Sequence, residues 1–117
     1  MKYILNIGLN GNIYGKVIEQ LNNLKGANWF NNYHITEQLG EYNNIPEQTA
    51  VISLDSDADY TSTLILVKKL CTSLNQECIP IQMIDKNNFG FGTLVYNDNF
   101  KGKKQTFNKD YFINKHK

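Results

Sequence analysis

The sequence predicts an α+β domain built around an antiparallel sheet, because one strand-helix-strand unit occurs twice along the chain. In each half, a short apolar strand is followed by an amphipathic helix and then by a second strand. Both helices are apolar on one side only, which favours two helices packed on the same face of one sheet. At 117 residues, the chain has the usual size of a single domain.

The first unit covers residues 3–39. Residues 3–7 are expected to form a strand. Residues 13–24 are expected to form a helix, because their main apolar positions recur at spacings of four, four and three. Residues 33–39 alternate in polarity, which is typical of a strand with one face on the core and the other in water, and His34 falls on the wet face. Residues 40–46 are expected to be a polar turn.

The second unit repeats this order, with an expected strand at residues 50–54, a helix at 60–74 and a strand at 78–84. The pattern is that of a ferredoxin-like split βαβ sandwich, a four-stranded antiparallel sheet with two helices on one face. Pro80 lacks a backbone N–H and therefore favours an edge strand or the first residues of a strand. The ferredoxin-like topology offers such an edge to its last strand.

Beyond this core, assigned to residues 1–85, residues 86–117 are expected to form a basic β-hairpin and tail within one domain spanning 1–117. Residues 93–96 read as a short strand, and residues 105–107 as its hairpin partner. The segment has too few apolar residues for a core of its own.

Charge is distributed unevenly around a formal net charge of +1. Residues 1–85 carry five lysines and nine acidic residues, a net charge of −4, whereas residues 86–117 carry seven lysines and two acidic residues, a net charge of +5. The chain has no arginine, so it cannot use the bidentate guanidinium contact common in carboxylate and phosphate recognition. The asymmetry predicts an interaction surface on the C-terminal segment.

Lysines and aromatic side chains alternate in this segment, as in many proteins that hold single-stranded nucleic acid. The residues expected to bind a partner are Phe100, Lys101, Lys103, Lys104, Phe107, Lys109 and Tyr111. The alternative is a hairpin whose aromatic rings pack on the sheet and whose lysines keep its edge soluble.

Three acidic residues, Asp55, Asp57 and Asp59, alternate as at the start of an EF-hand loop. The loop then fails, because its sixth position is Tyr60 where glycine is needed and its twelfth is Leu66 where glutamate is needed. We therefore expect Asp57 or Asp59 to cap the second helix, with a weak divalent-metal site as the alternative.

No catalytic residue, metal site or cofactor is expected from the remaining candidates. The glycines between residues 6 and 15 lack phosphate-loop spacing. The sequence indicates no catalytic pairing of His34 or His116 with a cysteine or a serine. Cys71 and Cys78 are expected to be buried or half-buried thiols, and their spacing alone leaves a disulfide open.

Three segments, residues 3–9, 47–52 and 74–79, resemble short accessory proteins carried by phages and plasmids. Many such proteins modify or block host functions, including antiviral defence. The resemblance therefore implies a non-enzymatic binding module that inhibits a host protein or protein complex, as anti-CRISPR proteins do. It assigns no functional residue.

The alternative is a small nucleotide- or nucleic-acid-binding protein that acts through its basic C-terminal segment. A second copy of the chain is a further candidate partner, as a homodimer. No membrane partner is expected, because the longest apolar runs are far too short for a span. Residues 1–7 lack the pattern of a signal peptide, so the cytoplasm of a bacterial host is the expected location.

Overall fold

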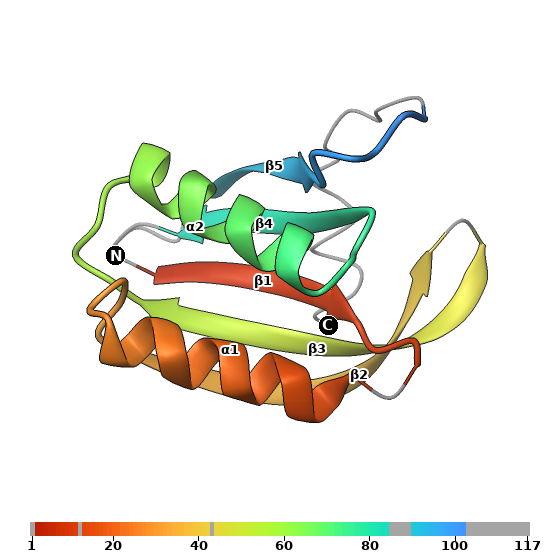
Figure 1. Ribbon diagram of the computed structural model, residues 1–117, viewed down its shortest axis with the longest axis horizontal. Coiled ribbons are helices and arrows are strands. Elements are labelled where there is room, and N and C mark those ends of the chain that lie inside the picture. The colour runs from red at the N-terminus through yellow and green to blue at the C-terminus, as the bar shows by residue number, and fades with distance from the viewer. Residues whose placement is uncertain (1, 12, 43, 85–89, 103–117) are drawn as a thin grey trace.

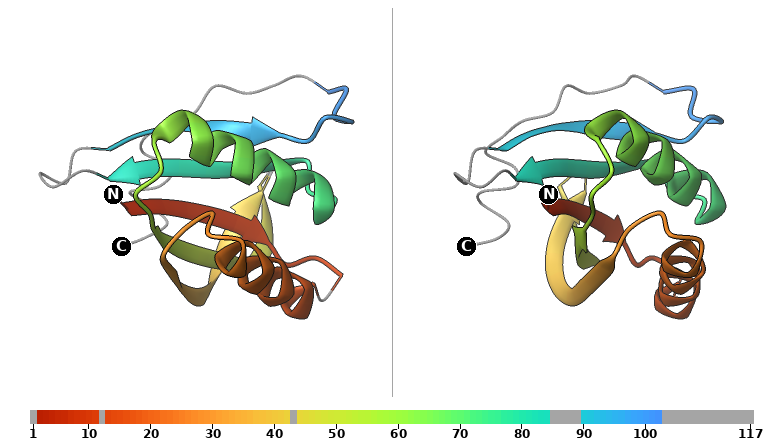
Figure 2. Two further views of the ribbon diagram at one scale, coloured as in Figure 1. Left: turned by 60° about the vertical axis from the view of Figure 1, so that its left-hand side comes forward. Right: turned by 90° about the vertical axis from the view of Figure 1, so that its left-hand side faces the viewer.

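The computed structural model describes residues 2–11, 13–42, 44–84 and 90–102. In chain order, its elements are β1 (Lys2–Gly8), α1 (Tyr14–Gly26), β2 (Asn32–Tyr42), β3 (Ile45–Asp55), α2 (Tyr60–Ser73), β4 (Cys78–Ile84) and β5 (Gly90–Tyr96). The strands form one antiparallel sheet in the order β2-β3-β1-β4-β5 (Figure 1). Both helices cover the same face of this sheet (Figure 2).

The predicted α+β class and the placement of both helices on one face are confirmed. The predicted four-stranded ferredoxin-like arrangement is wrong, because β5 pairs with β4 along its whole length and adds a fifth strand. The strand expected at residues 93–96 begins at Gly90. Its expected hairpin partner, residues 105–107, lies outside the described residues.

The core lies between the sheet and the two helices. Alternate residues of each inner strand point to the helix-covered face, as the pleat of a strand requires. The largest side chains that are fully buried there are Tyr3, Leu5, Ile7, Val17, Leu21, Ile52, Leu54, Leu66, Leu70, Ile79 and Ile81. The intervening residues of the strands, such as His34, Thr36 and Ser53, point to the other face of the sheet. None of the described helices lies on that face (Figure 2).

Of the two positions expected for Pro80, the edge strand is wrong, since β4 lies between β1 and β5, whereas a place among the first residues of a strand is correct, since Pro80 is the third residue of β4. Asn97 N–H donates to the Glu77 carbonyl at 3.0 Å, so every second residue from Glu77 directs its backbone groups toward β5. The backbone nitrogen of Pro80, which carries no hydrogen, therefore faces β1. The ladder between β1 and β4 ends at Leu5 and Ile81, immediately before that position, so the proline is accommodated inside the sheet.

The β2–β3 hairpin is longer than expected. The turn predicted for residues 40–46 is wrong, because β2 continues to Tyr42 and β3 begins at Ile45. Asn44 has a φ of 66°, a left-handed conformation that asparagine tolerates better than most residues. β1 pairs with β3 only over residues 49–55, so the last part of the hairpin extends past β1 (Figure 1). We call residues 39–42 and 44–48 the arm.

Candidate functional site

The predicted partner-binding residues fall largely outside the part of the chain that the structure describes. Lys103, Lys104, Phe107, Lys109 and Tyr111 are in this group. Of the other two, Lys101 is exposed. Phe100 packs its ring against Tyr96, with ring centroids 4.7 Å apart. The binding role of this basic segment stays a prediction.

The acidic cluster organises the start of α2. Asp59 Oδ1 accepts a hydrogen bond from the Ser62 N–H at 2.8 Å, which confirms the predicted helix cap and lowers the pKa of Asp59 below its usual value. Asp57 Oδ2 accepts a hydrogen bond from Asn31 Nδ2 at 3.0 Å. Among the described residues, no three potential metal ligands come together, in this cluster or elsewhere.

Both cysteines are free thiols, Cys71 buried and Cys78 half-buried. The Cys71 Sγ–H faces the carbonyl oxygens of Gln76, at 3.2 Å, and Val95, at 3.6 Å. Burial raises the pKa of Cys71 to about 12 and that of Cys78 to about 11. Both thiols are therefore protonated at neutral pH, when a nucleophilic cysteine would need to be a thiolate.

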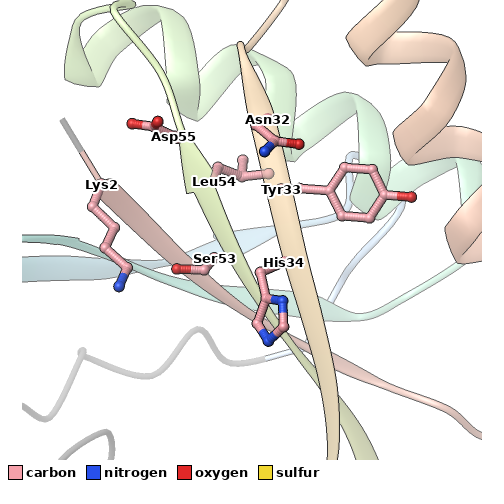
Figure 3. Close-up of a pocket in the computed structure, with 7 residues that line it drawn as sticks. All are labelled: Lys2, Asn32, Tyr33, His34, Ser53, Leu54 and Asp55. Carbon is pink, nitrogen blue, oxygen red and sulfur yellow. The ribbon is translucent and has the colours of Figure 1, made fainter.

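A shallow hollow of about 320 Å³ lies where the first residues of β1 and β2 meet the end of β3 (Figure 3). Its lining residues are Lys2, Asn32, Tyr33, His34, Ser53, Leu54 and Asp55. The Tyr33 ring points away from His34, and its hydroxyl donates to Asn22 Oδ1 of α1 at 2.8 Å. His34 lies on the exposed side of β2, as predicted.

The hollow contains the residue types of a hydrolytic triad. Ser53 stands opposite His34 in the sheet register, and Asp55 follows two residues later on the same strand. No hydrogen bond joins these three side chains to one another, so the contact between nucleophile and base that such catalysis uses is not formed. Sequence reasoning missed this grouping because it arises from the register of β2 against β3.

The outer side of β2 is a second polar feature, made of backbone groups. Leu9 N–H donates to the Gln48 carbonyl at 2.8 Å, which fixes the hydrogen-bonding phase of β3. Every second residue of β3 from Gln48 therefore directs its backbone groups to β1, and the residues between them direct theirs to β2. Thr36 lies opposite Val51, so its backbone N–H and C=O groups bond to β3. The backbone groups of its neighbours, Ile35 and Glu37, therefore point away from β3, toward the outer side of the sheet.

β2 is the last described strand on its side of the sheet, so within the described part of the chain these outward groups have no neighbouring strand. They belong to Tyr33, Ile35, Glu37 and Leu39. We call these four residues, with their outward N–H and C=O groups, the β2 edge.

The arm continues from this edge and carries two exposed apolar side chains. Leu39 is 74% exposed and Ile45 is 67% exposed, the highest fractions among the large hydrophobic residues of the described part of the chain. Single exposed apolar residues are common on protein surfaces. The register of β2 against β3 pairs Leu39 with Gln48 and Ile45 with Tyr42, so the two exposed side chains lie on opposite faces of the ribbon.

The base of the arm is held against the rest of the sheet. The Leu9–Gln48 backbone bond lies there, and Asn10 Nδ2 donates to Glu47 Oε2. The Glu47 carboxylate lies over Gly8, where an added Cβ would come within 2.1 Å of Glu47 Oε1. A larger residue at position 8 would push the flexible end of the Glu47 side chain aside and so disturb its hydrogen bond to Asn10.

Comparison of the chain with protein-family models, curated proteins and solved structures gave no match. Among the residues that the structure describes, neither helix has the length and apolar character needed to cross a bilayer.

Proposed function

We propose that this chain is a non-enzymatic binding module that recognises a partner protein through the arm and the β2 edge. A host protein or protein complex, of the kind implied by the resemblance to phage and plasmid accessory proteins, is the proposed partner. The supporting observation is that Leu39 and Ile45 are exposed on a ribbon whose base is fixed.

Leu39 and Ile45 are suited to contribute much of the binding free energy. Full burial of a leucine or isoleucine side chain contributes about 1.5–3 kcal/mol. Both side chains are mostly exposed in the free chain, so most of that contribution is available on binding. The hydrogen bonds at the base of the arm reduce the conformational entropy that binding would otherwise cost.

The test compares two variants with the parent chain. In the first, Leu39→Ser is combined with Ile45→Ser to remove the apolar arm residues. The matched control is Ile65→Ser, which removes a side chain that is 51% exposed on α2. Each protein is immobilised, used for affinity capture from bacterial lysate, and the captured proteins are quantified by mass spectrometry.

We expect a protein that the parent and the Ile65→Ser control capture equally and the arm variant does not. Its purified form should bind the parent in a calorimetric titration and lose at least tenfold in affinity for the arm variant. The proposal fails if every protein captured by the parent is captured equally by the arm variant.

A further inference from the structure

We infer that the β2 edge accepts an extended segment of the partner as an added strand, with a basic residue of that segment placed near Glu37. The inference rests on the proposed function and specifies the mode of binding and the chemistry of the partner segment.

The backbone of the β2 edge has the groups that strand addition needs. Its four residues offer four N–H donors and four C=O acceptors on the outer side of the sheet. They span residues 33–39, about 20 Å at the usual rise of a strand. Main-chain bonds of this kind provide affinity in strand addition, and alternate side chains provide specificity.

Apart from the charge of its two glutamates, β2 lacks the usual protection of an edge strand. Natural edges are commonly blocked by proline, lysine, a bulge or short length. β2 has eleven residues, none of them proline or lysine, and pairs with β3 in an unbroken register that leaves no room for a bulge. The opposite edge strand, β5, has seven residues. The longer edge is therefore the better template for another strand.

The side chains of β2 specify the partner segment. On the helix-covered side, exposed Glu37 lies between half-buried Ile35 and exposed Leu39. On the open side, His34, Thr36 and Gln38 are polar and exposed. On one side, a complementary strand carries an apolar, a basic and again an apolar residue at three alternate positions, to match Ile35, Glu37 and Leu39. On its other side it carries polar residues.

Charge favours a basic segment over a second copy of the chain. Residues 1–85, which include the whole of β2, have a net charge of −4. In an antiparallel pairing of two β2 edges about Thr36, each Glu37 would stand opposite Ile35 of the second copy, and the two carboxylates would lie diagonally across the pair. That arrangement gives Glu37 no opposite charge.

The test uses a displayed library of nine-residue peptides, selected on the immobilised full chain. Enriched peptides should alternate apolar and small polar residues, with lysine or arginine between two apolar positions. A selected peptide is then titrated by fluorescence anisotropy against the parent, Glu37→Gln and Glu37→Pro. Glu37→Gln should weaken binding a few-fold and reduce its salt dependence. Glu37→Pro, which also removes an outward N–H, should weaken binding at least tenfold.

A second measurement does not depend on the folding of a variant. Two N-methylated forms of the selected peptide are made. In the first form, the methylated amides are those on one side of the extended peptide, and in the second form they are those on the other side. One form should keep its affinity for the parent, and the other should lose at least tenfold, because only one side of an added strand bonds to β2.

The inference is overturned if no alternating peptide is enriched, or if both methylated forms bind equally. It is also overturned if the parent forms a concentration-dependent dimer that Glu37→Pro abolishes, which would assign the edge to a second copy. Arm-dependent capture of a protein, combined with failure of these peptide tests, would leave the proposed function standing and remove only strand addition.

Discussion

Adjacent residues of β2 should respond very differently to proline, because their N–H groups point to opposite sides. Thr36 and Glu37 are both exposed, so neither substitution removes a core side chain. Thr36 bonds Val51 of β3, whereas the N–H of Glu37 faces away from the sheet. Thr36→Pro therefore breaks the ladder, and Glu37→Pro leaves it intact.

The expected magnitudes follow from the lost hydrogen bond. Removing the bond costs about 0.5–1.5 kcal/mol, and leaving the half-buried Val51 carbonyl without a donor costs about 1–3 kcal/mol more. Thr36→Pro should thus reduce the free energy of unfolding by about 2–4 kcal/mol. Glu37→Pro should reduce it by about 1 kcal/mol or less, since edge strands tolerate an outward proline.

Thermal unfolding followed by circular dichroism measures both effects. For a chain of this size, Thr36→Pro should lower the Tm by about 10 °C and Glu37→Pro by a few degrees. Equal losses, or a larger loss for Glu37→Pro, would refute the assignment of the outward backbone groups.

Three further predictions concern the core, the α2 cap and the thiols. Leu5→Ala empties a position that is 0% exposed between Ile52 and Ile81, so it should cost about 2–5 kcal/mol in urea unfolding, while Ile65→Ala should cost about 0.5 kcal/mol or less. Asp59→Ala should lower the Tm more than Asp59→Asn, because asparagine can also accept the Ser62 hydrogen bond; equal losses would contradict the cap. The pKa of Cys71 is raised from 9.0 to about 12, so the protonated thiol stabilises the fold below pH 9, and this contribution should disappear as the pH rises from about 9 to about 12. The parent should therefore lose more stability than Cys71→Ala over that range, and parallel pH curves would contradict the buried thiol.

Local periodicity was sufficient to predict most elements of this fold. The helix-period spacing around Val17 and Leu21 predicted α1, and the strand expected at residues 78–84 coincides with β4. These signals depend on which side chains face the core within one element. Each element can therefore be recognised without knowing its neighbours.

Pairing between strands could not be predicted in the same way. The polar composition of residues 40–46 indicated a turn, but cross-strand pairing with β3 extends β2 through most of that segment. Pro80 indicated an edge, yet the missing donor fits inside the sheet where the ladder to β1 ends. The β2 edge was missed for the same reason, since the direction of each N–H depends on register and carries no signal in composition.

Amide hydrogen exchange measured by NMR would test the β2 edge most directly. In the free chain, the outward amides of Tyr33, Ile35, Glu37 and Leu39 should exchange much faster than those of His34, Thr36 and Gln38, which bond β3. Addition of the selected peptide should slow exchange at the outward positions by at least tenfold and leave the inward positions nearly unchanged. Protected outward amides in the free chain, or unchanged exchange there in the complex, would contradict binding by strand addition at β2.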